Sequence, residues 1–195
     1  TGLVDRGLPP LELGARGAVR QPVHLERAGL EHVGEGDEVA PGARGHDHLV
    51  IAKAAGADTT HVDSIKQVVN WANENQELSN LKDVRWVVED ALKFVKRELK
   101  RGKKYNGIIL DPPAFGHGPN GEKWKLEDHI QEMMQDVVQL LDPEEHFLIL
   151  NTYSLGFSSV IVENLIKASF PQAQNLEIGE LYLPATSGSK LPLGV

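Results

Sequence analysis

The sequence contains no cysteine. This absence excludes disulfide bonds, thiolate metal sites and a cysteine nucleophile. It fits a reducing compartment, and we therefore expect a cytoplasmic protein. Nowhere in the 195 residues does an apolar run approach the roughly 18 residues that a membrane-spanning helix needs. The first residues also lack the basic start and apolar core of a signal peptide, so we expect no membrane partner.

Positive charge is scarce as well. The chain has 20 Lys and Arg against 28 Asp and Glu, which gives a net charge of −8. Proteins that hold nucleic acid by charge alone are usually basic. If this chain acts on nucleic acid, we expect a further domain upstream to bind the polyanion.

The first 50 residues lack the large side chains that build a hydrophobic core. Residues 1–50 contain no Lys, Ile, Phe, Tyr, Trp, Met, Ser or Asn, yet they hold 9 of the 19 glycines. They show no sustained helical or strand periodicity. We predict that residues 1–50 are a poorly ordered segment, and two explanations stay open: a flexible arm, or a coding sequence read in a shifted frame. The folded domain then spans residues 51–195.

From residue 51 onward, helical and strand patterns alternate. Strands of apolar residues are separated by amphipathic segments, a pattern that predicts a doubly wound, mostly parallel sheet of Rossmann-like α/β type. Such sheets bind ligands at the carboxyl ends of their strands. The expected strands are 59–63, 84–88, 105–110 and 146–150 with a terminal pair at 176–183 and 191–195, and the expected helices are 65–75, 91–101, 124–141 and 158–170.

Acidic residues follow three successive strands of this sheet. Asp63 ends the first strand, Asp90 follows the second and Asp111 ends the third. A carboxylate at such a position can accept two hydrogen bonds from a ribose diol. Aspartate is also a common helix cap, and for Asp90 that alternative stays open.

The run Asp111-Pro112-Pro113-Ala114-Phe115 is the strongest local signal. The prolines stiffen the chain and remove two backbone donors, while their carbonyl groups remain and can point into a site. Asp111 adds a carboxylate acceptor, and Phe115 offers a face on which a base can stack. Acceptors beside an aromatic ring suit a planar substrate that carries an amino group. The alternative is a rigid turn with Phe115 in the core.

The runs HVDSIKQVVNWANEN (61–75) and WVVEDALKFVKRELKRGKKYNGIILDPPAFG (86–116) resemble class I S-adenosylmethionine-dependent methyltransferases. The similarity is greatest to bacterial 23S rRNA methyltransferases of the cytosine-5 and guanine-N7 group, and it covers about residues 51–195. It implies S-adenosylmethionine as cofactor and RNA, a ribosomal RNA in particular, as substrate. It further implies that Asp63 with Ser64 holds the ribose, that Asp90 with Ala91 lies near the adenine, and that Asp111, Pro112, Pro113 and Phe115 form the catalytic motif, with Asp111 also close to the cofactor.

The sequence departs from that family in two places. The family's first strand and glycine-bearing loop should precede Gly56, so the central strand of the sheet is predicted to be missing or replaced. Residues 18–25 could fill it, but Pro22 argues against a central position. The second departure lies at residues 151–154, where the cytosine-5 enzymes carry a cysteine. Without it we expect direct methyl transfer, either to a ring nitrogen, which needs no base, or to an exocyclic amine, which would benefit from Asp111.

Two other functions stay open. A nicotinamide-dependent oxidoreductase also places an acid after its second strand, but it predicts a GxGxxG loop, which the sequence lacks. A truncated domain without catalysis is the other alternative. His46 and His48 are too few for a metal site, and we expect none. The basic residues within 96–104 either contact phosphates or form a solvated helix end, the latter being favoured.

Overall fold

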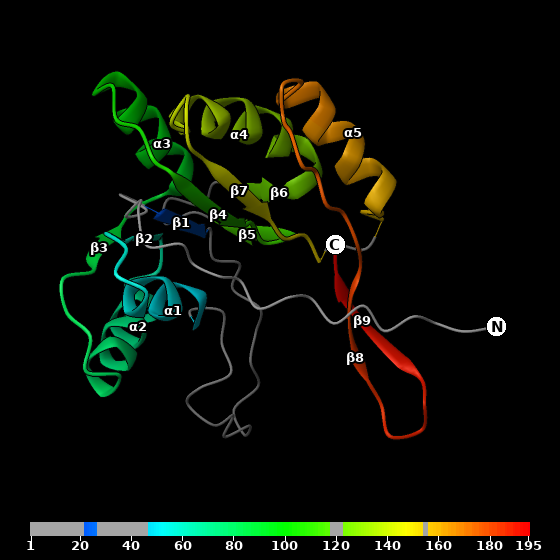
Figure 1. The fold of residues 1–195 in the computed structure, drawn as a ribbon, viewed down its shortest axis with the longest axis horizontal. Helices are drawn as coiled ribbons and strands as arrows, with labels where there is room; N and C mark the ends of the chain where they lie inside the picture. Colours follow the sequence, from blue (N-terminus) through cyan, green and yellow to red (C-terminus); the bar gives the residue numbers. More distant parts are fainter. Residues whose placement is uncertain (1–21, 27–46, 118–122, 154–155) are drawn as a thin grey trace.

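The computed structural model describes residues 22–26, 47–117, 123–153 and 156–195, and Figure 1 shows their arrangement. Five parallel strands form the main sheet, in the spatial order β3-β2-β1-β4-β7. Its strands are β1 (Pro22–Glu26), β2 (Thr60–Asp63), β3 (Arg85–Val88), β4 (Gly107–Asp111) and β7 (Phe147–Leu150).

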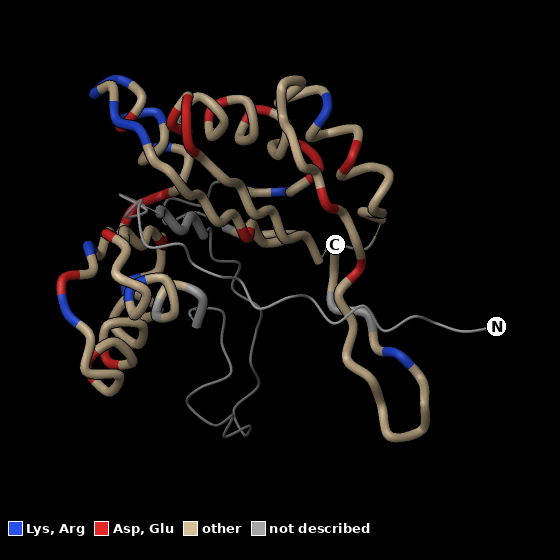
Figure 2. The backbone as a smooth tube through the Cα atoms, viewed as in Figure 1, with Lys and Arg blue, Asp and Glu red and all other residues tan. Residues whose placement is uncertain are grey.

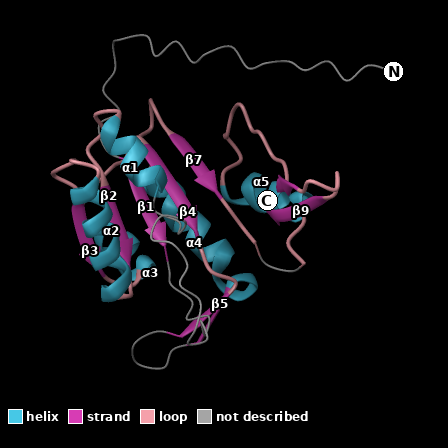
Figure 3. Ribbon diagram, turned by 90° about the horizontal axis from the view of Figure 1, so that it is seen from below, coloured by secondary structure: helices cyan, strands magenta, loops and turns pink. Residues whose placement is uncertain are grey.

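Helices cover both faces of this sheet. Figures 1 and 3 show α1 (Asp47–Ala54) and α2 (Lys66–Leu78) on one face, and α3 (Ala91–Lys100), α4 (Leu126–Leu140) and α5 (Ser159–Ser169) on the other. The predicted doubly wound α/β class is therefore confirmed. Two small antiparallel ladders complete the described elements, β5 (Phe115–His117) with β6 (Lys123–Lys125) and β8 (Leu181–Pro184) with β9 (Lys190–Gly194).

The hydrophobic core lies between the sheet and the α3–α4 layer. Phe94 of α3, Ile108 and Leu110 of β4 and Met134 of α4 are fully buried there. Because β4 contributes side chains to this core, its carboxyl end is held firmly where Asp111 emerges. Trp86 of β3 is only half-buried.

The central strand is present: of the two predicted outcomes, missing or replaced, the structure excludes the first, and Pro22–Glu26, which overlaps the segment 18–25, fills the position. β1 pairs with β2 on one side and with β4 on the other, so that Pro22 lies beside Gly107 and Glu26 beside Asp111. Pro22 is tolerated because it is the first residue of the strand, where a missing donor interrupts no further pairing. Within the segment predicted to be poorly ordered, residues 1–21 and 27–46 lie outside the described residues. Helix α1 begins at Asp47.

We expect the amide hydrogens of residues 23–26 to exchange slowly, at rates close to those of β4. A strand with a neighbour on each side opens only with the sheet as a whole. Hydrogen-exchange mass spectrometry measures this, with the exposed two-stranded ladder of β8 as a fast reference. Exchange in residues 23–26 as fast as in β8 would contradict the central position of β1.

Several element boundaries differ from the sequence prediction by a few residues. Helix α4 begins at Leu126 instead of residue 124, because Lys123–Lys125 pair with Phe115–His117 in a short ladder. The predicted terminal strand pair is present, but β8 begins at Leu181, five residues after the expected start at 176.

Candidate active site

The acidic strand ends meet at one edge of the sheet. Asp63 is the last residue of β2 and pairs with Val88 of β3, while Asp111 is the last residue of β4. Since all five strands are parallel, these carboxyl ends lie on the same side, with Asp90 just beyond β3. The fold therefore brings together the three acids that the sequence singled out.

One carboxylate oxygen of Asp63 has no hydrogen-bond partner among the residues that the structure describes. Its side chain is 1% exposed, and its Oδ1 accepts a hydrogen bond of 2.6 Å from the Ile65 amide. The other oxygen, Oδ2, is buried and has no hydrogen-bond donor among the described residues. Burial raises the pKa of Asp63 to about 6, although the Ile65 hydrogen bond acts in the opposite direction. A buried acceptor without a donor costs free energy that a ligand hydroxyl group would recover.

Ser64 does not cap the following helix. The N-cap of α2 is Ile65, and no side chain caps it. Asp63 already binds the Ile65 amide, which explains why a serine at position 64 is not needed there. Ser64 is half-buried beside Asp63.

Asp90 acts as a helix cap, the alternative that the sequence left open. Its Oδ1 accepts a hydrogen bond of 3.1 Å from the Lys93 amide at the start of α3. Ala91, next to it, is fully buried in the core. The neighbouring Glu89 amide donates to the Asp63 carbonyl at 3.0 Å, which ties this turn to the end of β2.

Asp111 is paired with a residue that sequence reasoning did not single out. The Asn151 side chain donates from Nδ2 to Asp111 Oδ1 at 3.0 Å. Burial raises the pKa of Asp111, and the Asn151 hydrogen bond partly offsets that rise. Asn151 directly follows β7, so its position one strand away from Asp111 is the only signal that could have indicated it.

The two prolines after Asp111 form a rigid, buried turn. The Trp124 indole Nε1 donates to the Pro113 carbonyl at 2.7 Å, and the Leu126 amide donates to the Ala114 carbonyl at 3.0 Å. One of the two proline carbonyl groups that the sequence left able to point into a site, that of Pro113, thus accepts a hydrogen bond from Trp124. These two hydrogen bonds connect the turn to β6 and to the start of α4.

Phe115 emerges from this turn with 60% of its surface exposed. That exposure rules out the alternative in which Phe115 belongs to the core. Its ring face is available for stacking, as the first interpretation of the motif requires.

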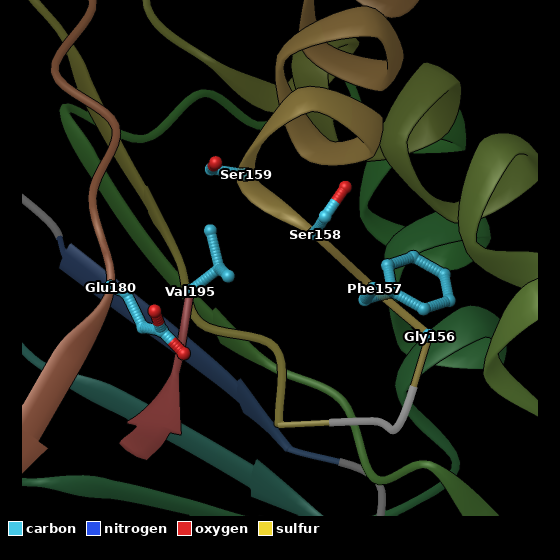
Figure 4. A pocket seen from close by; sticks show the side chains of 6 residues that line it. All are labelled: Gly156, Phe157, Ser158, Ser159, Glu180 and Val195. Carbon is cyan, nitrogen blue, oxygen red and sulfur yellow. The ribbon is translucent and has the colours of Figure 1, made fainter.

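A hollow lies next to this edge, beyond the end of β7. It has a volume of about 310 Å³, and Figure 4 shows the side chains around it. Thr152 and Val195 exchange two backbone hydrogen bonds of 2.7 and 2.8 Å, so the wall of the hollow is connected to the residue after Asn151. No motif in the sequence indicates this space. Its lining residues are Gly156, Phe157, Ser158, Ser159, Glu180 and Val195.

The basic residues of 96–104 gather at the end of α3, as Figure 2 shows. Helix α3 starts at the carboxyl edge of the sheet and returns to the amino edge, so this cluster lies away from the candidate site. Lys96 pairs with Glu132 at 2.6 Å, and Arg101 pairs with the buried Glu98 at 3.1 Å. These ion pairs favour the interpretation as a charged helix end over phosphate binding.

Metal and membrane sites are not found in the described part of the chain. No group of three or more His, Asp or Glu there could hold a metal ion. Within the same residues, every helix is too short or too polar to cross a bilayer.

Comparison with known proteins adds to this geometry. The sequence matches no protein-family model. It is 29% identical over 107 residues to the ribosomal RNA large subunit methyltransferase K/L of Shewanella frigidimarina, covering 53% of this chain and 14% of that protein. It is 34% identical over 82 residues to a candidate ribosomal RNA large subunit methyltransferase of Methanocaldococcus jannaschii, covering 41% of this chain and 21% of that protein.

Solved structures show the same likeness. The S-adenosylmethionine-dependent methyltransferase of Agrobacterium tumefaciens aligns with a TM-score of 0.73 and 32% identity, over 90% of this chain and 54% of that one. A candidate methyltransferase in complex with SAH aligns with a TM-score of 0.64 and 19% identity, over 86% of this chain and 40% of that one. The chain thus spans about half or less of the length of each of these proteins.

Fold and sequence together define the class. The chain has the Rossmann-like fold of the class I S-adenosylmethionine-dependent methyltransferases, and the resemblance predicted from its sequence is confirmed. Within that class, its similarity extends to methyltransferases of large-subunit ribosomal RNA.

Proposed function

We propose that this chain is the catalytic part of an S-adenosylmethionine-dependent methyltransferase that modifies a base of 23S ribosomal RNA. Transfer is direct, because the chain has no cysteine to form a covalent intermediate. The reaction takes place in the cytoplasm, and a domain outside this chain binds most of the RNA. The single observation that carries the proposal is the buried Oδ2 of Asp63 at the carboxyl edge of the sheet, which no group in the described part of the chain hydrogen-bonds.

The residues at this edge fit the cofactor. Asp63 supplies a buried carboxylate that can accept a hydrogen bond from a ribose hydroxyl group, and Ser64 lies beside it. Asp90 and Ala91 follow the neighbouring strand β3, and the adenine of the cofactor would lie against them. When bound, S-adenosylmethionine supplies a methyl group that is already activated on a sulfonium. The protein therefore has to hold the acceptor in line and exclude water.

Asp111 and Phe115 are suited to hold the base that receives the methyl group. Phe115 presents an exposed ring on which a base can stack, and Asp111 lies at the start of the same turn. The buried prolines 112 and 113 and the Trp124 hydrogen bond keep the turn rigid. Rigid placement of the acceptor is the main contribution a protein can make to such a transfer.

Isothermal titration calorimetry with S-adenosylmethionine, and with NAD as the matched control, tests the proposal first. Transfer of a tritiated methyl group to unmodified 23S RNA transcript tests it next. We expect cofactor binding without NAD binding, followed by transfer to RNA. NAD binding would favour an oxidoreductase, and no binding of either compound would favour a domain without catalysis.

We expect Phe115→Ala to reduce turnover on RNA by roughly 5- to 150-fold, which corresponds to the ~1–3 kcal/mol of a base–aromatic stack. Cofactor affinity should stay within about twofold, because the ring lies beyond the ribose and adenine positions. Thermal stability should hardly change, since the side chain is already exposed. Phe115→Tyr retains the ring face and is the control that should keep most activity. A fully active Phe115→Ala protein would remove the stacking role.

A further inference from the structure

Asn151 is fixed to β4 at two adjacent points. Its backbone amide donates to the Leu110 carbonyl at 3.0 Å, and its side-chain Nδ2 donates to Asp111 Oδ1 at 3.0 Å. The first bond continues the pairing of β7 with β4 by one residue beyond the ladder. The side chain of Asn151 is therefore placed by the sheet itself and not by a mobile loop.

The orientation of the Asn151 amide follows from its partner. An ionised carboxylate only accepts hydrogen bonds, so the NH₂ group must face Asp111 and the carbonyl oxygen must face away. That oxygen, Oδ1, is buried and has no donor among the described residues. Asp111 makes no second hydrogen bond in the described part of the chain, so its Oδ2 is also free to accept. Of the two remaining acceptor oxygens of the pair, Asp111 Oδ2 is the one open to a bound substrate, while Asn151 Oδ1 is buried.

We propose that Asn151 is a positioning residue that orients Asp111, and that the pair selects an exocyclic amino group of the target base as methyl acceptor. This inference rests on the proposed function. An amino group carries N–H donors, one of which can bond to Asp111 Oδ2. A ring nitrogen such as guanine N7 offers only a lone pair, which that oxygen repels. A carbon acceptor offers no hydrogen bond and would require the missing cysteine.

The transfer balances with these groups. The lone pair of the amino nitrogen forms the new N–C bond to the methyl carbon while the C–S bond breaks and its electron pair goes to sulfur. The nitrogen becomes positively charged, and one of its protons passes to Asp111 Oδ2 and from there to water. A base with its proton-accepting oxygen held in place contributes roughly 10²- to 10⁴-fold in such steps. Asn151 serves this step by keeping Asp111 Oδ1 occupied, which leaves Oδ2 directed at the substrate.

The identity of the product tests the acceptor class. Methylated 23S RNA transcript is digested to nucleosides and examined by mass spectrometry. We expect the methyl group on an exocyclic nitrogen of adenine, cytosine or guanine. A methyl group on a ring nitrogen or a carbon of the base overturns the inference while the proposed methylation of a base stands. A methyl group on a ribose oxygen overturns both. Failure to bind S-adenosylmethionine in calorimetry overturns both.

Asn151→Ala tests the positioning role, and Asn106→Ala is its matched control. Asn106 precedes β4 at the opposite edge of the sheet, and its side chain donates to the Glu145 carbonyl at 2.8 Å. We expect Asn151→Ala to lower kcat by roughly 10- to 100-fold with KM for RNA and cofactor affinity within about twofold, a share of the general-base effect. Asn106→Ala should leave kcat unchanged.

A measurement without turnover completes the test. In protein labelled with ¹³C at aspartate carboxyl groups, with the signal assigned by Asp111→Asn, the pKa of Asp111 should rise in Asn151→Ala. The reason is the loss of a hydrogen bond to the charged form. Asn106→Ala should not move it. An unchanged pKa of Asp111, or an effect of Asn151→Ala on KM alone, would show that Asn151 does not orient Asp111.

Discussion

Asp63→Asn is expected to make the protein more stable at pH 8 and at the same time to weaken S-adenosylmethionine binding. Asp63 is buried, and one of its oxygens has no partner within the described ranges, so its charge destabilises the folded state. A rise in pKa from 3.8 to about 6 corresponds to about 3 kcal/mol at most. Asparagine removes the charge but brings an NH₂ group that also needs a partner, so the net gain will be smaller. The affinity loss should be roughly 10- to 150-fold, the ~1.5–3 kcal/mol of one hydrogen bond to a charged acceptor.

The pH dependence of this effect has a definite sign. Below pH 3.8 Asp63 is protonated in both the folded and the unfolded state, and the wild type carries no penalty. Between pH 3.8 and about 6 the folded state binds the proton more tightly, so the stability of the wild type falls as the pH rises. Above about pH 6 the penalty is complete and constant. The stability difference between Asp63→Asn and the wild type should therefore grow across this range and then level off.

Urea denaturation from pH 4 to 8 and calorimetry at pH 8 measure the two effects. Asp58→Asn is the matched control, because Asp58 is exposed just before β2 and loses the same charge. It should change neither stability nor affinity. A destabilised Asp63→Asn protein with unaltered cofactor affinity would show that Asp63 serves the fold and not the ligand.

Trp124→Ala should lower the free energy of unfolding by about 3–5 kcal/mol, the usual cost of removing a large buried side chain. Trp124 is 1% exposed and packs beneath the turn after Asp111. Since domains are stable by only about 5–15 kcal/mol, much of this protein should unfold in mild denaturant. Trp71→Ala is the control, because Trp71 on α2 is 43% exposed and should cost far less.

Trp124→Phe separates packing from positioning. It keeps most of the apolar volume but removes the hydrogen bond to the Pro113 carbonyl, which would remain buried without a donor. We expect a loss of about 1–3 kcal/mol in stability. Turnover should fall while cofactor affinity is retained, because the loosened turn carries Asp111 and Phe115. Denaturation monitored by circular dichroism measures the free energy of unfolding, and the transfer assay measures turnover. Retained turnover in a destabilised protein would limit Trp124 to a structural role.

The sequence by itself determined the fold class and the edge at which the site lies. Strand and helix patterns are local, and alternating strands and helices allow few arrangements besides a parallel sheet covered on both faces. Once the strands are parallel, residues at their carboxyl ends must share one edge, which is why Asp63 and Asp111 could be placed in advance. The motif around Phe115 was visible for the same reason, since it follows a strand directly.

Only the tertiary structure decided which chemical groups meet there. The segment Pro22–Glu26 has a weak strand pattern, and its place between β2 and β4 depends on pairing with strands tens of residues away. Asn151 reaches Asp111 across 40 positions of sequence, and Trp124 reaches Pro113 across 11. Likewise, only the structure shows that Asp90 caps α3, because the helix begins at Ala91. Hydrogen bonds between distant residues depend on how whole layers pack, and no local pattern encodes that packing.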